Sequence, residues 1–247
     1  MIHPSAIISP NAKIGKNVNI GPFCTVHDYV EIGDNVTIDS YCELGIPTHL
    51  ANSNALSIGE NAKIRSHSCL YVGSTLGANF TSGHHITIRE NSSIGCNVQL
   101  GSRGDIQGDC AIGNYTKMHA DVHIGKKSKV GNYVWMFPEV LLTNDPTPPS
   151  EILLGVTIED FVVLAAKALI LPGVIIGKDA VVAAGSVVKS NIPNGQLFSG
   201  NPAKFICDAK ILRVSGNIKE KVYPWRYRFH RGYDENDIQE WLNELVK

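Results

Sequence analysis

The sequence predicts an all-β fold, a solenoid of short parallel strands followed by a C-terminal helical tail. From Ile88 to Leu142, apolar residues recur every six positions without a miss. The repeating residues are Ile88, Ile94, Leu100, Ile106, Ile112, Met118, Ile124, Val130, Met136 and Leu142. A small or β-branched residue often stands four places later, as Ser92 and Val98 do. Neither a helix of period 3.6 nor an alternating strand keeps a six-residue period, so the pattern favours a solenoid over a β-sandwich with irregular turns.

The geometry of each coil follows from the repeat. Three six-residue units make an eighteen-residue triangular coil, and successive coils stack as parallel strands ~4.8 Å apart. The repeating apolar residue points inward, and the residue four places later is small because two large side chains per unit would overfill the interior. Gly or Asn often follows the apolar residue, as in Ile14-Gly15 and Ile94-Gly95, and these residues tolerate tight corners.

Three stretches interrupt the repeat before residue 206. The period fails over 45–55, which predicts a short loop extruded from one corner. Ser82 stands where an apolar residue is expected, so 77–85 is predicted to be a distorted coil or an exposed loop. The longest interruption lies between Leu142 and Ile158 and includes three prolines within four positions, which indicates a stiff loop. The repeat closes at 200–204.

A change of pattern near residue 207 divides the chain into a β-helix domain, 1–206, and a helical cap, 207–247. Residues 208–221 are compatible with a helix, and 236–247 has helical spacing with Asn236 as a possible N-cap. The stretch between them, 223–231, is basic and aromatic. We expect the tail to cover the exposed strand edges at the end of the solenoid and to contact a neighbouring subunit. The alternative is that its Arg and aromatic residues touch a nucleotide.

The composition narrows the class of protein. The chain has 247 residues, of which 43% are hydrophobic, and a formal net charge of −1. This charge gives no support for a nucleic-acid partner. Because no run of eighteen apolar residues and no basic-then-apolar leader is present, we expect neither membrane spanning nor secretion. Cys24, Cys42 and Cys110 occupy small interior positions of the repeat, which is typical of a reducing cytoplasm.

The hexapeptide repeat, the proline-bearing loop and the closing run Gly200-Asn201-Pro202-Ala203-Lys204 resemble the left-handed β-helix acyltransferases over residues 1–206. The resemblance implies a left-handed helix, a homotrimer, and acyl-donor sites between neighbouring prisms. It also implies an acyl-CoA co-substrate, although some members use an acyl carrier protein. We expect no metal.

Two subfamilies have a similar layout. The length, the tail and the run Leu142-Thr143-Asn144-Asp145-Pro146 after the coil of His119 and His123 resemble the nucleotide-sugar N-acyltransferases. Those enzymes acylate an amino group on a dTDP- or UDP-linked deoxysugar for surface glycans such as lipopolysaccharide. The chain also resembles the UDP-N-acetylglucosamine O-acyltransferases of lipid A synthesis, which carry a His-Ile-Ala-His-Asp stretch. The matching stretch here is His123-Ile124-Gly125-Lys126-Lys127, and Lys126 in place of the second, catalytic histidine argues against that reaction.

The predicted site residues follow from this resemblance and from their places on the prism. His123 is the candidate base, and Asp145 is expected to orient the substrate amine, unless it only forms an Asx turn ahead of Pro146. The candidate substrate contacts are His84 (or its neighbour His85), His119 and Asn144. The candidate CoA contacts are Ala165, Ala166, Ala184, Gly185, Lys189 and Lys204. One column on the outer surface is predicted to contain His119, Phe137, Ala165 and Ala183.

Three rival functions remain open. The second choice is an O-acetyltransferase of a sugar or small hydroxylated metabolite. A third is a zinc enzyme like the trimeric γ-class carbonic anhydrases, but His84 and His85 stand 35 and 34 residues before His119, and the expected interval of two coils is 36. The fourth is a non-catalytic scaffold, which tight CoA binding would exclude.

Overall fold

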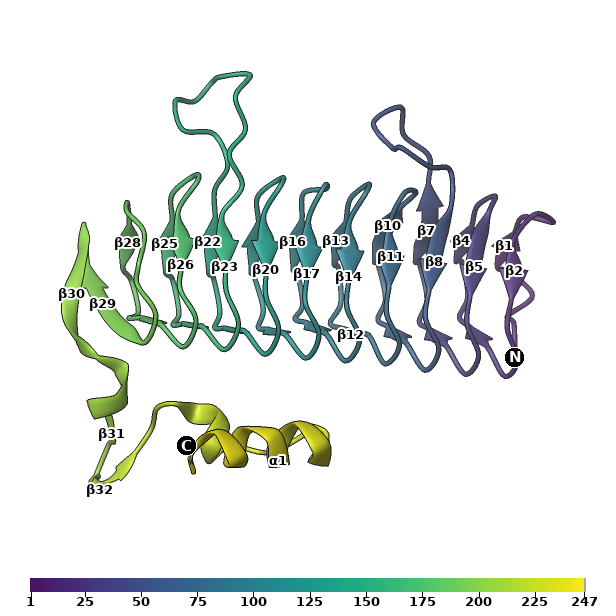
Figure 1. Cartoon of the computed structure of the whole chain (residues 1–247). Coiled ribbons are helices and arrows are strands. Elements are labelled where there is room, and N and C mark those ends of the chain that lie inside the picture. The colour runs from purple at the N-terminus through teal and green to yellow at the C-terminus, as the bar shows by residue number, and fades with distance from the viewer. Residues whose placement is uncertain (247) are drawn as a thin grey trace.

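The computed structural model describes residues 1–246 and confirms the predicted β-helix: the chain winds into a three-sided prism of parallel strands with a C-terminal helix (Figure 1). Strands one coil apart pair in register, so that Ile106 lies beside Ile124 and Ile124 beside Leu142. The helix is left-handed, as the resemblance implies.

The three faces of the prism are called the first, second and third sheets. The first sheet contains β1 (Ile7–Ile8), β4 (Thr25–Val26), β7 (Glu43–Ile46), β10 (Cys69–Tyr71), β13 (Thr87–Ile88), β16 (Asp105–Ile106), β19 (His123–Ile124), β22 (Leu141–Leu142), β25 (Leu169–Ile170) and β28 (Val187–Val188). The second contains β2 (Lys13–Ile14), β5 (Val30–Ile32), β8 (Leu56–Ile58), β11 (Thr75–Leu76), β14 (Ser93–Ile94), β17 (Ala111–Ile112), β20 (Lys129–Val130), β23 (Thr157–Ile158) and β26 (Ile175–Ile176). The third contains β3 (Asn19–Ile20), β6 (Thr37–Ile38), β9 (Lys63–Ile64), β12 (Thr81–Ser82), β15 (Gln99–Leu100), β18 (Lys117–Met118), β21 (Trp135–Met136), β24 (Val163–Leu164), β27 (Val181–Val182), β29 (Gln196–Gly200) and β30 (Ala203–Asp208).

The interior is filled as the repeat predicts. The repeating apolar residues from Ile20 onward are buried, and the small residues four places later lie beside them. Where that small residue is Ser or Thr, its hydroxyl bonds a corner carbonyl: Ser128 Oγ donates to Gly125 O at 2.6 Å, and Thr116 Oγ1 to Gly131 O at 2.8 Å. These bonds satisfy polar groups that burial would otherwise leave unpaired. Cys24, Cys42 and Cys110 are buried and unbridged.

The prediction of a distorted coil at 77–85 is wrong. Strand β12 pairs in register with β15, Thr81 beside Gln99 and Ser82 beside Leu100. Phe80, which is fully buried, fills the interior that Ser82 leaves free. The Ser82 hydroxyl instead accepts a hydrogen bond from the Arg65 N–H at 2.9 Å. A large neighbour and a backbone bond therefore keep the coil regular.

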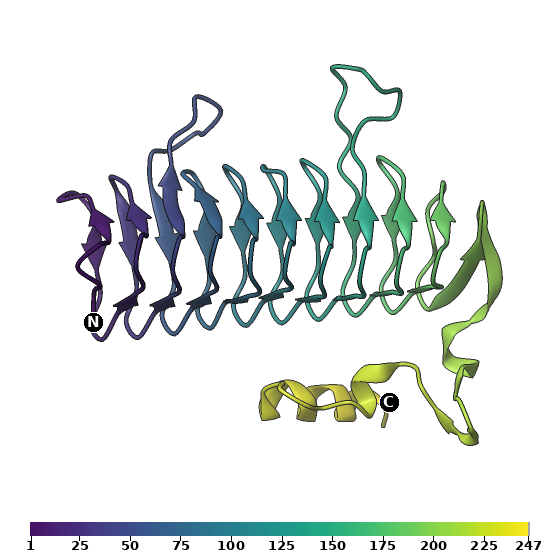
Figure 2. The same ribbon diagram turned by 180° about the vertical axis from the view of Figure 1, so that it is seen from behind.

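Both predicted loops leave the prism at the corner between the first and second sheets. One follows β7 and the other follows β22, and they project in the same direction in Figures 1 and 2. The second loop spans 143–156. The two loops therefore lie on one side of the molecule, opposite the tail.

The residue type at the corner between the second and third sheets changes along the axis, from asparagine in the early coils to aromatic residues in later ones. Its left-handed (φ > 0) positions in the early coils form a ladder of side-chain amide bonds through Asn17, Asn35, Asn61, Asn79 and Asn97. Asn is one of the few residues that adopts this conformation readily. The next three coils carry Tyr115, Tyr133 and Phe161, whose rings stack with centroids 5.1 and 5.0 Å apart. This stack of three rings is the docking surface for the tail.

The tail does not cover the end of the solenoid as predicted. The last strand, β30, runs antiparallel to β29 and closes the third sheet. The chain then forms a 3₁₀ turn (Ala209–Ile211) and a hairpin of β31 (Arg213–Val214) and β32 (Asn217–Lys221), so the helix considered for 208–221 is absent. Beyond the hairpin the chain folds back beneath the third sheet (Figures 1 and 2).

The tail ends in a 3₁₀ turn (Trp225–Tyr227) and helix α1 (Glu235–Glu244). Asp234, not Asn236, caps α1, because its side chain accepts from the Asn236 N–H. Trp225 and Trp241 pack edge-on against Phe161. Lys247, the last residue of the predicted helical segment, lies outside the described residues. No helix within residues 1–246 has the length and apolarity needed to cross a membrane.

Candidate active site

A histidine and an aspartate pair on the outer face of the first sheet. His123 on β19 and Asp105 on β16 stand eighteen residues apart and are register partners. His123 Nδ1 lies 2.9 Å from Asp105 Oδ2, and the two side chains are 38% and 29% exposed. The facing carboxylate favours a proton on Nδ1, which leaves the Nε2 lone pair available for an incoming group. This is the arrangement of a general base held by an orienting acid.

The environment of Asp105 keeps its carboxyl group ionised. Burial raises the pKa of Asp105, but hydrogen bonds from His123 and Gln107 outweigh it, and the net pKa lies below the ordinary value. Gln107 Nε2 donates to Asp105 Oδ2 at 2.5 Å. Sequence reasoning missed Asp105, although its position one coil before His123 was the signal that could have found it.

The predicted partner of His123, Asp145, uses its carboxylate inside its own loop. It accepts from Thr147 N at 3.0 Å and from Ser150 N at 2.8 Å, and Ser150 Oγ donates to it at 2.6 Å. These bonds hold the pKa of Asp145 below its ordinary value. The hydrogen bond from Thr147 N forms an Asx turn, which is the alternative role that the sequence predicted for Asp145. A role for Asp145 in orienting the substrate stays a prediction.

Asn144 lies at the root of the same loop, above the corner that follows His123. A Cβ atom built on Gly125 would lie 3.3 Å from Asn144 Cβ. The Asn144 carbonyl accepts from Leu154 N at 2.7 Å and closes the base of the loop. Asn144 is therefore near the corner beside His123, and its contact with a substrate stays a prediction.

Lys126 is charged and forms salt bridges with two carboxylates. Its Nζ lies 3.2 Å from both Glu90 Oε1 and Asp109 Oδ2, and the Glu90 side chain is fully buried. Burial lowers the pKa of Lys126, but the two carboxylates outweigh this effect and raise it above its ordinary value. Because Lys126 is already protonated, it cannot act as a general base toward the amino or hydroxyl group of a substrate.

The other candidate histidines lie at the corner between the third and first sheets. His84 and His119 line different pockets, and His84 Nδ1 bonds Ser66 Oγ at 2.9 Å. The ring of His85 stacks on His67 with centroids 4.7 Å apart. The structure therefore does not bring His84 or His85 together with His119. Within residues 1–246, no three His, Cys, Asp or Glu side chains are grouped as metal ligands.

The predicted outer column at this corner is confirmed. His119 stacks on Phe137 at 4.9 Å, and backbone bonds continue the column through Ala165 to Ala183. The proposed CoA contacts Ala165, Ala166, Ala184 and Gly185 lie along its upper part, where a Cβ built on Gly185 would meet nothing within 4 Å. Lys189 and Lys204 are exposed, but Lys189 follows β28 at a different corner and Lys204 is on β30. CoA contacts at these residues stay a prediction.

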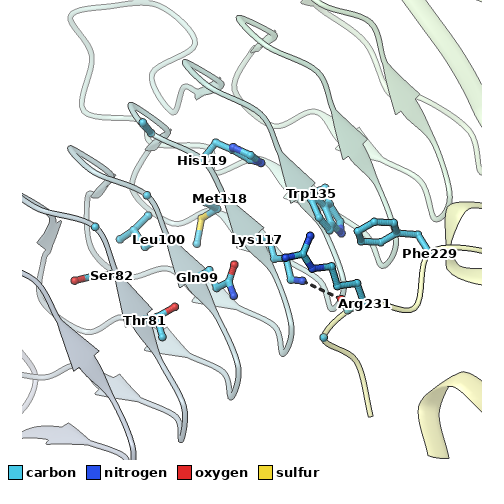
Figure 3. A pocket seen from close by; sticks show the side chains of 14 residues that line it. Thr81, Ser82, Gln99, Leu100, Lys117, Met118, His119, Trp135, Phe229 and Arg231 are labelled. Atoms are coloured by element: carbon cyan, nitrogen blue, oxygen red, sulfur yellow. Dashed lines mark hydrogen bonds between the residues drawn. The ribbon is translucent and has the colours of Figure 1, made fainter. Parts of the chain in front are cut away.

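His119 also borders a pocket of about 600 Å³ between the third sheet and the tail (Figure 3). The sheet contributes Thr81, Ser82, Gln99, Lys117 and Trp135, and the tail contributes Phe229, Arg231 and Gly232. Sequence reasoning missed Lys117 and Trp135. They are outward-facing register partners, but nothing in the repeat predicts that the tail folds back over them.

Known proteins match this chain in sequence and in fold. Residues 11–45 and 155–190 match the family described as bacterial transferase hexapeptide (six repeats). The chain is 37% identical over 92 residues to γ carbonic anhydrase 2 of Arabidopsis thaliana, covering 35% of this chain and 33% of that protein. It is 45% identical over 75 residues to the 2,3,4,5-tetrahydropyridine-2,6-dicarboxylate N-acetyltransferase of Staphylococcus aureus, covering 30% of each. The chain thus spans about a third of the length of these curated relatives.

The fold likeness extends over the whole chain. The structure of the Arabidopsis UDP-N-acetylglucosamine acyltransferase superposes with a TM-score of 0.72 at 20% identity, covering 99% of this chain and 89% of that one. The repeat, the in-register prism and these matches agree. The chain therefore carries hexapeptide repeats of this transferase family at 11–45 and 155–190, and the whole chain has the left-handed β-helix fold.

Proposed function

We propose that this protein is an acyltransferase that transfers an acyl group from acyl-CoA to the amino group of a nucleotide-linked amino-deoxysugar, such as a dTDP-3-amino-3,6-dideoxyhexose. The observation that carries the proposal is the His123–Asp105 pair on the outer face of the prism. The names of the relatives support the reaction class, because they include an N-acetyltransferase and an acyltransferase that acts on a nucleotide sugar.

The pair supplies what acyl transfer to an amine requires. The amine nitrogen attacks the thioester carbonyl, and Nε2 of His123 takes the proton that the nitrogen loses. The carbon–sulfur bond then breaks, and the imidazolium returns that proton to the leaving thiolate. Asp105 stabilises the imidazolium between the two steps. A positioned base of this kind contributes about 10²–10⁴-fold to the rate.

The proposal includes a homotrimer in the cytoplasm. The resemblance to left-handed β-helix acyltransferases, which are typically homotrimers, supports the three-fold assembly, and clefts between prisms would give the donor a groove beside the small residues Ala165, Ala166 and Ala184. The six cysteines, all unbridged, support a reducing compartment. Sedimentation of the purified protein tests the assembly: a mass of three chains is expected, and a monomer at assay concentrations contradicts it.

The reaction is tested with a panel of acyl-CoAs and of dTDP- and UDP-linked aminosugars, following release of free thiol. Thiol release that depends on an aminosugar, with an amide product found by mass spectrometry, is the expected result. The proposal fails if no aminosugar releases thiol.

O-acylation is the second candidate, since the same His–Asp pair can deprotonate a hydroxyl group. The fold likeness to a UDP-N-acetylglucosamine acyltransferase favours it. Adding the matching hydroxysugars to the panel separates the two reactions. Thiol release from a hydroxyl acceptor, with none from an aminosugar, selects O-acylation.

Zinc-dependent hydration is a third candidate, and the sequence match to γ carbonic anhydrase 2 favours it. Metal analysis of the purified protein, combined with a CO₂ hydration assay, decides this case. One zinc per chain together with hydration activity would select the zinc enzyme.

A further inference from the structure

Within residues 1–246, two cations in the pocket between the third sheet and the tail, Lys117 and Arg231, have no acidic partner. The Lys117 ammonium donates to the Arg231 carbonyl oxygen at 3.5 Å and lies over the rings of Trp135 and Tyr233, at 5.0 and 4.6 Å from their centroids. Among the ion pairs of residues 1–246, none includes Lys117 or Arg231, whereas Arg103 pairs with Asp121. The two charges therefore approach one another with no carboxylate to neutralise them.

This arrangement is costly without an anion. Burial lowers the pKa of Lys117, and the neighbouring charge of Arg231 lowers it further. An anion between the two side chains would offset both effects, because an opposite charge at short range favours the ammonium form. Arg and Lys together are typical phosphate ligands.

The walls of the pocket are suited to flat rings and hydroxyl groups. Trp135 and Phe229 meet edge-on with centroids 5.5 Å apart and present aromatic surface to the pocket. Thr81, Ser82 and Gln99 border the opposite side (Figure 3) and offer hydrogen-bonding groups. The volume of about 600 Å³ lies within the usual range for small-molecule sites.

Both halves of the pocket are held firmly. Trp135 Nε1 donates to Tyr233 Oη at 2.7 Å, which ties the sheet to the tail two residues after Arg231. A Cβ built on Gly232 would lie 3.6 Å from Lys117 Nζ, so the tail backbone passes close to the ammonium. The two cations are thus placed in advance of any ligand.

We propose that this pocket binds a nucleoside diphosphate, with the diphosphate between Lys117 and Arg231 and the base against Trp135 or Phe229. The inference rests on the proposed function, since both substrates of that reaction carry such a group. The acceptor carries the nucleotide of the aminosugar, and the donor carries the 3′-phosphorylated adenosine diphosphate of CoA. His119 borders the pocket four residues from His123, a span of at most about 14 Å along the chain.

Isothermal titration of the full-length protein with UDP, dTDP, GDP and CoA tests the site without requiring turnover. We expect at least one of these ligands to bind, with an affinity that falls as salt rises. Preference for a pyrimidine or guanine nucleotide identifies the acceptor as the source, and preference for CoA identifies the donor. Absence of binding by all four at millimolar concentration overturns the inference.

The variants Lys117→Gln and Arg231→Gln are each expected to weaken binding about 10- to 100-fold, which is the usual effect of losing a charge-assisted hydrogen bond. Lys129→Gln is the matched control, because Lys129 is the exposed residue at the equivalent position of β20 on the second sheet. Unchanged affinity in Arg231→Gln, whose side chain is exposed and unpaired in residues 1–246, overturns the inference even if Lys117→Gln folds poorly.

The outcome can be separated from that of the proposed function. If nucleoside diphosphates bind at this pocket and no acyl transfer occurs, the pocket stands and the reaction fails. If acyl transfer depends on His123 while the pocket variants keep full affinity for every ligand, the reaction stands and the pocket assignment fails.

Discussion

His123 Nδ1 lies 2.9 Å from Asp105 Oδ2, and the two residues occupy the same position on consecutive coils. In a β-helix with an eighteen-residue coil, residues that far apart in sequence become direct neighbours. The carboxylate that orients His123 is therefore in the coil before it, whereas Asp145 in the following loop bonds its own loop backbone.

Replacing the histidine tests its role as the base. In His123→Gln we expect kcat for acyl transfer to fall about 10²–10⁴-fold, because the group that takes the proton is lost. The thermal midpoint should stay close to that of the wild type, since the side chain is 38% exposed. His49→Gln, in the exposed loop at the other end of the prism, is the control and should keep full activity.

Asp105→Asn tests the positioning role. We expect a smaller loss of kcat than in His123→Gln, with little change in KM, because the imidazole keeps its place but loses the carboxylate that fixes its tautomer. Asp105→Glu should recover part of the activity, and Asp145→Asn should reduce kcat less than Asp105→Asn does. A larger loss of kcat in Asp145→Asn than in Asp105→Asn would reverse the two roles.

The lowered pKa of Asp105 also predicts a stability effect in acid. A carboxyl group with a lowered folded-state pKa stabilises the fold above its unfolded pKa of about 3.9 and loses this contribution as the pH falls through the folded value. The difference in unfolding free energy between wild type and Asp105→Asn should therefore be constant near neutrality and shrink below about pH 4. Chemical denaturation at a series of pH values measures it.

Phe80 should be a major contributor to the stability of the early coils. Because Ser82 contributes little volume to the interior, Phe80→Ala leaves a cavity and should cost about 3–5 kcal/mol. Phe23→Ala removes the same side chain from a corner where it is 58% exposed, and should cost much less. Urea unfolding of both variants gives the comparison. Equal losses would contradict the interior role of Phe80.

Arg226 should control attachment of the tail. Its side chain is 5% exposed and pairs with Asp179 at 3.3 Å and with Glu244 at 2.9 Å. Removing one partner of a buried pair typically costs 3–5 kcal/mol. In Arg226→Ala we expect faster amide exchange in α1 and little change in the central coils, because solenoid contacts are local. The exposed Arg228→Ala is the control.

The structure of the repeating coils could be predicted from the sequence, whereas the contacts of the non-repeating tail and loop could not. The period of six gave the prism, its buried residues and the outer column from His119 to Ala183, because register follows from counting. The same period places Asp105 one coil before His123, as its register partner, whereas the nearby loop after His123 contains Asp145. At Ser82 the period suggested a distortion, and packing by Phe80 overrode it.

Contacts between the tail and the prism could not be predicted, because the tail does not follow the six-residue repeat. Trp135 and Tyr233 are 98 residues apart, and no spacing rule predicts their bond. The basic and aromatic character of 223–231 was visible, but its partner surface was not. The hydrogen bonds of Asp145 inside the proline loop depend on the backbone conformation of that loop. This conformation cannot be predicted from the sequence, because the loop does not follow the six-residue repeat.

The change from asparagine to aromatic rings at one corner determines where along the axis the tail rests. Every coil offers the tail a similar backbone outline, but at this corner, within residues 1–246, the rings lie on the coils of Tyr115, Tyr133 and Phe161. Whole coils could be gained or lost before Asn79 without moving the pocket, whereas transferring the rings to the preceding coils would carry it about 4.8 Å toward the N-terminus. The length of such a protein can thus vary during evolution independently of the position of its ligand site.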